Sequence, residues 1–190
     1  IRDLVRSRGL GDVYKRQCSK ILGYSECNLI QVPIYMQFKL VLNDTFDKYN
    51  CGEFDKKEND TISVSKSNFS HETDEVNVMI SDTYPLSLSQ LPEVKKNLPT
   101  LLISRNNTND VNRYDSPELV RCVVNEVRSL NNNIKKVNVY ATTNPLNTKN
   151  IASSAFKLGG RDNFNEVRVF QQERDGIRNF NNKGIVVYKR

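Results

Sequence analysis

Residues 116–130 read SPELVRCVVNEVRSL and carry the clearest structural signal in the chain. Ser116 can cap a helix, Pro117 suits the first helical position, and Glu118 favours the positive end of the helix dipole. Apolar residues then recur at helical spacing and form one broad stripe, made of Leu119, Val120, Val123, Val124, Val127 and Leu130. The segment therefore predicts an amphipathic helix that packs on a sheet.

Strands are predicted on both sides of this helix. Residues 98–104 form a compact apolar run before it, and residues 134–141 follow it with Val137 and Val139 on one face. A second helix is predicted over residues 147–158, where Gly159-Gly160 would end it. Residues 166–171 and 185–188 then predict an antiparallel hairpin, so the order from residue 98 onward is β-α-β-α-β-β.

The preceding part of the chain predicts an antiparallel meander. Residues 30–42 alternate between apolar and polar positions, with Val41 as the exception, which is typical of a half-buried strand. Because Pro33 has no N–H to donate, this strand is expected at an edge or with a bulge. Shorter alternating runs at residues 61–65 and 75–82 complete the meander. The predicted fold class is α/β (α+β), a mixed sheet with this N-terminal antiparallel meander and with helices packed on the sheet.

The first 17 residues are predicted to be foreign to the natural protein. They read IRDLVRSRGLGDVYKRQ and resemble the translation of a tagmentation sequencing adapter, so we expect a disordered, adapter-derived artefact. Residues 18–190 are then predicted to form a single α/β domain that is truncated at its N-terminus. Without the artefact the chain loses five basic and two acidic residues, which halves the net charge of +6. The charge therefore disfavours nucleic acid as a partner.

The sequence predicts neither a metal site nor a membrane span. The cysteines, Cys18, Cys27, Cys51 and Cys122, are irregularly spaced, and His71 is the one histidine. A zinc site needs closely spaced ligand pairs, so these thiols are expected to be isolated. No run approaches the roughly eighteen apolar residues that cross a bilayer. Localisation stays open with a cytoplasmic site slightly favoured, and nothing indicates the oligomeric state.

The predicted element order resembles the GNAT acyltransferase architecture over residues 31–190. Three stretches carry the resemblance, VNVYATTN at 137–144, AFKLGG at 155–160 and VYKR at 187–190. The resemblance implies an N-acyltransferase that uses acetyl-coenzyme A (acetyl-CoA) and binds its pyrophosphate at the N-terminal amides of the central helix. By that resemblance the cofactor-binding residues would be Arg113, Tyr114, Asp115 and Ser116.

The chain also departs from that family, which leaves the function open. The family has glycines that let the backbone approach phosphate, and Asp115, Ser116 and Pro117 stand in their place here. The domain is therefore expected to be either an active acyltransferase or a degenerate one that has lost this activity. Its catalytic residues are unknown, and Glu75 is the candidate by residue type for accepting the proton of an amine substrate.

Two further hypotheses compete with the acyltransferase. One is a non-catalytic α/β interaction module of a virus or mobile element, because the sequence has no phosphate loop, no triad-like set and no metal cluster. The other, which is less favoured, is a nucleic-acid-binding domain built on the cations and aromatic residues of the C-terminal stretch.

Overall fold

The structure of the chain is a computed structural model that describes residues 26–70, 73–106, 113–157, 164–173 and 178–190. The predicted artefact at residues 1–17, His71 and the pair Gly159-Gly160 lie outside these ranges.

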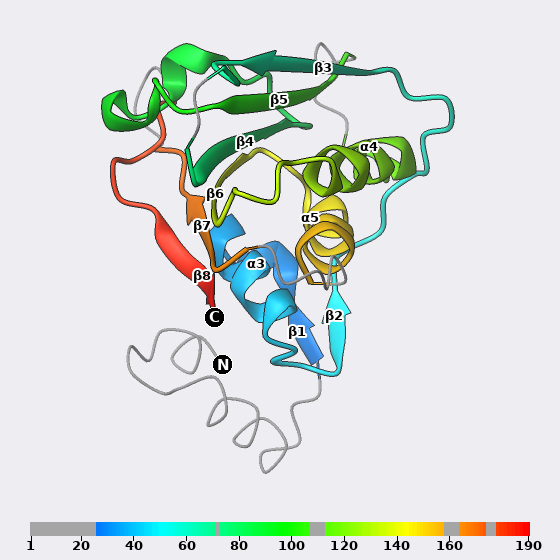
Figure 1. Cartoon of the computed structure of the whole chain (residues 1–190). Helices are drawn as coiled ribbons and strands as arrows, with labels where there is room; N and C mark the ends of the chain where they lie inside the picture. The colour runs from blue at the N-terminus through cyan, green and yellow to red at the C-terminus, as the bar shows by residue number, and fades with distance from the viewer. Residues whose placement is uncertain (1–25, 71–72, 107–112, 158–163, 174–177) are drawn as a thin grey trace.

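A mixed sheet of six strands forms the centre of the described structure (Figure 1). In chain order the strands are β3 (Ile62–Ser67), β4 (Glu75–Ser81), β5 (Thr100–Arg105), β6 (Lys136–Ala141), β7 (Glu166–Phe170) and β8 (Ile185–Lys189). In space their order is β3-β5-β4-β6-β7-β8. The four inner strands run parallel to one another, whereas β3 and β8 pair antiparallel at the two edges.

Three α-helices cover one face of this sheet (Figure 1). They are α3 (Ile34–Leu42), α4 (Pro117–Arg128) and α5 (Pro145–Ile151), the last of which continues into a π-helix, η4 (Ala152–Lys157). Phe38 of α3, Leu119 of α4 and Ile151 of α5 are fully buried in one hydrophobic core with strand residues such as Val78 and Val139. Burial of such side chains contributes about 1.5–3 kcal/mol each, so this core is the main stabilising layer.

Irregular segments, rather than α-helices, cover the opposite face of the sheet. Met79, Tyr140 and Phe170 point to that face and pack with Leu86, Leu91 and Phe180. The Tyr140 and Phe170 rings stack with centroids 4.5 Å apart, and Phe180 meets Tyr140 edge to face at 5.0 Å. The covering segments include two 3-10 turns, η2 (Leu88–Gln90) and η3 (Glu93–Lys95). In the described ranges, irregular segments and 3-10 turns therefore form a second hydrophobic layer on this face of the sheet.

The mixed α/β class and the order β-α-β-α-β-β from β5 onward are confirmed. The start of the central helix is also as predicted, because Pro117 is its first residue and the Ser116 side chain accepts a hydrogen bond from the Leu119 N–H at 3.3 Å.

The strand predicted over residues 30–42 is wrong, because residues 34–42 form the helix α3 instead. An additional 3-10 turn, η1 (Leu29–Gln31), precedes it, and a small parallel sheet of β1 (Glu26–Asn28) and β2 (Lys48–Asn50) lies beside it (Figure 1). Pro33 is the N-cap of α3, where its missing N–H is of no consequence. The buried residues Gln37, Phe38, Leu40 and Val41 follow helical spacing. A short apolar run is compatible with the period of a strand and with that of a helix, and the helix is the form that buries Phe38.

The predicted antiparallel meander also needs correction, because β3 and β4 do not pair with each other. β5 lies between them, antiparallel to β3 and parallel to β4. Residues 76–81 of β4 are all buried, as expected of a central parallel strand that is covered on both faces. Alternation along one strand does not specify which neighbour the strand takes or in which direction.

Candidate functional site

The strand order places a reversal of the chain between β4 and β6. β5 follows β4 on one side, and the chain then crosses to the other side to form β6 and β7. In open α/β sheets, ligands bind outside the carboxyl ends of the strands at such a reversal. The segments that leave β4 and β6 at this edge are residues 81–84 and 142–144, and they define the candidate site.

Hydrogen bonds lock these two segments together. The Thr83 N–H donates to the Thr142 carbonyl at 3.1 Å, and the Thr142 hydroxyl donates to the Tyr84 carbonyl at 2.8 Å. The Ser81 hydroxyl donates to the same Tyr84 carbonyl at 3.0 Å. The Tyr84 ring is half-buried, and the Arg178 guanidinium carbon lies 4.3 Å from the ring centroid. An aromatic ring and a cation therefore lie together at the reversal.

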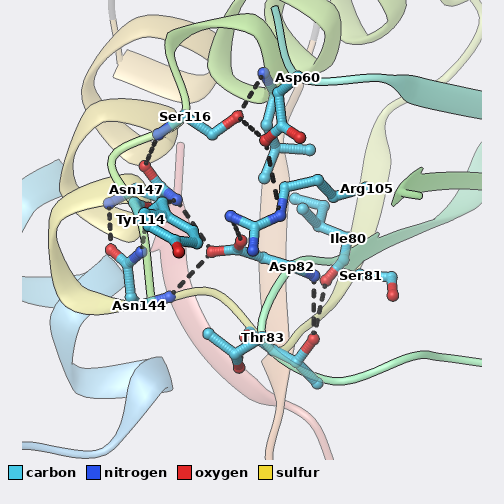
Figure 2. A network of polar contacts seen from close by, with 12 residues as sticks. Asp60, Ile80, Ser81, Asp82, Thr83, Arg105, Tyr114, Ser116, Asn144 and Asn147 are labelled. Carbon is cyan, nitrogen blue, oxygen red and sulfur yellow. Dashed lines mark hydrogen bonds and ion pairs between the residues drawn. The ribbon is translucent and has the colours of Figure 1, made fainter. Parts of the chain in front are cut away.

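A buried group of three charged side chains lies next to this edge (Figure 2). Arg105 ends β5, and its Nη1 lies 3.1 Å from Asp82 Oδ1 while its Nε lies 3.5 Å from Asp60 Oδ2. All three side chains have no exposed surface. We call Asp60, Asp82 and Arg105 the buried ion cluster. Because two carboxylates face one guanidinium in a region without water contact, the cluster depends on additional hydrogen bonds.

Two asparagines and a serine supply these hydrogen bonds (Figure 2). The Ser116 hydroxyl donates to Asp60 Oδ2 at 2.8 Å, and the Asn147 amide donates to Asp82 Oδ2 at 2.9 Å. The Asn144 N–H donates to the same Asp82 oxygen at 3.2 Å. Asn144 also caps α5, since its Oδ1 accepts from the Asn147 N–H at 2.9 Å. The cluster thus ties the first turns of α4 and α5 to the end of β4.

Burial raises the pKa of Asp82 above its usual value, and the negative charge of Asp60 adds to this effect. The hydrogen bond from Asn147, the charge of Arg105 and the Asn144 N–H oppose it. Asp60 Oδ2 and both carboxylate oxygens of Asp82 are paired within the network, so the arrangement is suited to holding structural elements in place.

The four residues predicted to bind a cofactor fall at the border of this network. Ser116 is fully buried, while Tyr114 is half-buried and its carbonyl accepts from the amides of Asn144 and Asn147 at 2.7 and 3.0 Å. Asp115 pairs through its backbone with residues 55 and 57, and Arg113 is exposed.

The central residues of the network were not predicted from the sequence. Asp82 fell at the end of the strand predicted over residues 75–82, while Asp60 and Arg105 lay just outside the strands predicted over residues 61–65 and 98–104. One signal was available, because polar residues directly follow three strands whose carboxyl ends meet at one edge. Using it requires knowing that β4, β5 and β6 are parallel neighbours.

Other parts of the described structure offer less chemistry. No group of three potential metal ligands occurs among the described residues. Burial raises the pKa of the Cys27 thiol to about 11, with a further contribution from Cys51, which keeps the thiol protonated. A hollow of about 380 Å³ runs between α4 and α5, and its lining includes one acidic residue, Asp115, and one basic residue, Arg121. That mixture is poorly suited to a polyanion.

Comparisons with known proteins give the family and the fold. The family model of the SMODS- and Ubiquitin system-associated 2TM effector domain matches residues 12–187. A comparison with curated proteins found no match.

Solved structures of Cap4 SAVED/CARF-domain containing receptors are similar in fold. The receptor from Acinetobacter baumannii with the cyclic trinucleotide 3'3'3'-cAAA matches with a TM-score of 0.62 at 9% identity, over 90% of this chain and 41% of that one. The same receptor with 2'3'3'-cAAA gives 0.63 at 9% identity, also over 90% of this chain and 41% of that one. The Moraxella osloensis receptor matches with a TM-score of 0.52 at 10% identity, over 92% of this chain and 40% of that one. The chain thus spans about two fifths of the length of these receptors.

These findings correct the resemblance to GNAT acyltransferases. The resemblance depended on element order, and the same order along the chain is compatible with different strand pairings. Acetyl-CoA as the cofactor is also corrected, since two of the similar structures are described with cyclic trinucleotides and none with acetyl-CoA. The start of α4 gives a physical reason, because the Ser116 and Leu119 N–H groups already donate to Asn147 Oδ1 and Ser116 Oγ. Few amides remain there for a pyrophosphate.

The word 2TM in the family description has no counterpart in the described ranges, where no helix is both long and apolar enough to cross a membrane. The family model nonetheless matches most of the sequence. The chain therefore belongs to the family of the SMODS- and Ubiquitin system-associated 2TM effector domain.

Proposed function

We propose that this chain is a non-catalytic recognition module and that its ligand is a cyclic oligonucleotide. The ligand would bind at the carboxyl edge of β4 and β6, beside residues 81–84 and 142–144. The observation that carries the proposal is the reversal of strand order at this edge, in a fold similar to that of receptors described with cyclic trinucleotides.

The non-catalytic assignment is supported by the state of the polar groups near this edge. The carboxylates of Asp60 and Asp82 are buried and bonded to Arg105, Ser116 and Asn147. A general acid or base must reach the proton that it transfers, and these two side chains have no exposed surface. The geometry therefore favours binding over reaction.

The charges around the edge suit an anionic ligand. Arg178 is exposed above Tyr84, and the Lys57 ammonium lies 5.1 Å from the Tyr114 ring centroid. Arg113 is also exposed and leads into α4. In this proposal Arg113 and Tyr114 contact the ligand, while Asp115 and Ser116 hold the turn in place. Cations next to aromatic rings are typical of sites that stack bases and neutralise phosphates.

Isothermal titration calorimetry of the full chain tests the proposal. We expect saturable binding of 3'3'3'-cAAA or 2'3'3'-cAAA, weaker binding of the linear trinucleotide, and none of acetyl-CoA. The affinity is expected to fall as salt is added, because phosphates are neutralised on binding. Equal affinity for the linear and cyclic forms, or no binding of either cyclic form at millimolar concentration, would contradict the proposal.

A further inference from the structure

We propose that Arg178 is the phosphate-binding residue of this site and that Tyr84 positions it. The inference rests on the proposed function in one respect, since it takes the phosphate to belong to a cyclic oligonucleotide.

The first argument is how the arginine is presented. The guanidinium lies over the Tyr84 ring, 4.3 Å from its centroid, and the Arg178 side chain is exposed. Stacking uses the face of the planar guanidinium, whereas its N–H donors lie along the edge. In the part of the chain that the structure describes, no carboxylate forms an ion pair with Arg178. Among the described residues, the edge of the stacked guanidinium is thus not taken up by an ion pair and can face the oxygens of a phosphate.

The second argument is that the backbone around Arg178 is fixed. Arg178 has a φ of 56°, a conformation that few residues other than glycine adopt. The Gln172 side chain donates to the Arg178 carbonyl at 2.8 Å, and the Glu173 N–H donates to the Asn179 carbonyl at 2.8 Å. Phe180 is almost fully buried and anchors the segment on the sheet. The backbone of Arg178 is therefore held in place, and less backbone freedom is lost when a ligand binds.

The third argument is the position of Tyr84. Its carbonyl accepts from Ser81, at the end of β4, and from Thr142, just after β6. The backbone of Tyr84 is thereby held at the strand reversal, where α/β sheets bind nucleotides, and its half-buried ring lies there with it.

Calorimetric titration of variants with 3'3'3'-cAAA tests the inference. We expect Arg178→Ala to raise Kd about tenfold or more, because charge-assisted hydrogen bonds are lost. Arg178→Lys should lie between Arg178→Ala and the parent, since lysine keeps the charge without the fork. Tyr84→Phe should bind like the parent, and Tyr84→Leu should raise Kd because the stacking platform is lost. Arg128→Ala is the matched control, since Arg128 is exposed in the last turn of α4.

A second measurement separates this inference from the proposed function. The Nε–Hε resonance of Arg178 is followed by NMR while inorganic pyrophosphate is added to the full chain. If the parent binds 3'3'3'-cAAA and Arg178→Ala binds it equally well, the inference is overturned and the proposed function stands. If the parent does not bind the cyclic trinucleotide but pyrophosphate shifts the resonance, the proposed function fails and the phosphate-binding role stands. If neither probe acts, both are overturned.

Discussion

The ring of Phe170 leaves no space for a side chain at residue 184. A Cβ built on Gly184 would lie 2.6 Å from Cε2 and Cζ of that ring, which is closer than real Cβ atoms approach. Phe170 is almost fully buried and stacks on Tyr140 at 4.5 Å, so it cannot move away freely. Glycine at this position is therefore required by the packing of the second face.

Gly184→Ala is expected to destabilise the protein by about 1–3 kcal/mol, the usual range for inserting a methyl group into a packed core. Urea unfolding of the parent and the variant measures the effect. In a Phe170→Leu background the same alanine should cost less, because the smaller side chain vacates part of the contact. An equal loss in both backgrounds would show that the ring is not the cause.

At the scale of elements, the buried ion cluster connects segments that are far apart in the sequence. Asp60 precedes β3, Asp82 follows β4 and Arg105 ends β5. Through Ser116 and Asn147 the cluster also holds the first turns of α4 and α5 (Figure 2). Five elements thus share one set of polar contacts, and Arg105 is linked to both helix starts through the two carboxylates.

Arg105→Leu is expected to cost about 3–5 kcal/mol, because it leaves two buried carboxylates without their cation. The exposed residue Arg121 on α4 provides a matched control, and Arg121→Leu should change stability by at most about 0.5 kcal/mol. Unfolding by denaturant at neutral pH compares the two variants. Similar small decreases in the free energy of unfolding for both variants would contradict a stabilising role for the cluster.

The first part of the chain shows why short apolar segments are hard to assign. Residues 30–42 alternate well enough for a strand, yet residues 34–42 form α3. Gln37, which the strand prediction placed on the polar face, is buried, and its amide donates to the Leu29 and Val32 carbonyls at 3.1 and 3.0 Å. A buried glutamine whose amide donates to two backbone carbonyls is a tertiary arrangement, and the sequence pattern does not indicate it.

At the scale of the whole molecule, a polar network opposite the helical face links the amino ends of the strands. Glu75 accepts from Lys95 at 2.5 Å and from Asn138 at 2.8 Å. Burial by itself would raise the pKa of Glu75, but the bonds and the charges of Lys95 and Lys136 outweigh it and leave the pKa below its usual value. Glu75 therefore belongs to this ion pair. Among the described residues, no hydrogen bond or ion pair of Glu75 reaches residues 81–84 or 142–144 at the carboxyl edge.

The pH dependence of global stability follows from this lowered pKa. The ionised Glu75 stabilises the folded chain above the ordinary glutamate pKa of about 4.3, and that contribution is lost as the pH falls through the lower folded value. We expect Glu75→Gln to lower the free energy of unfolding by about 1 kcal/mol at neutral pH. Between about pH 5 and pH 3 the free energy of unfolding of this variant should decline less steeply than that of the parent.

Denaturant unfolding over this pH range checks the expectation. Glu93→Gln is the matched control, because the Glu93 side chain is 85% exposed in its pair with Lys96. Parallel pH profiles for the parent and Glu75→Gln would show that the Glu75 pair does not contribute.

Sequence patterns alone predicted the mixed α/β class, the central helix with its Ser116 cap, and the order of elements from β5 onward. These features depend on local patterns, since caps, periodic burial and turn residues act within a few positions. Tertiary structure decided the pairing of β3 and β4 on opposite sides of β5 and the helical state of α3. It also decided the convergence of Asp60, Asp82 and Arg105, which are separated by more than twenty residues in each case. These contacts form because the parallel strands β4 and β5 end at one edge and the antiparallel strand β3 begins there, and a linear pattern does not contain that alignment.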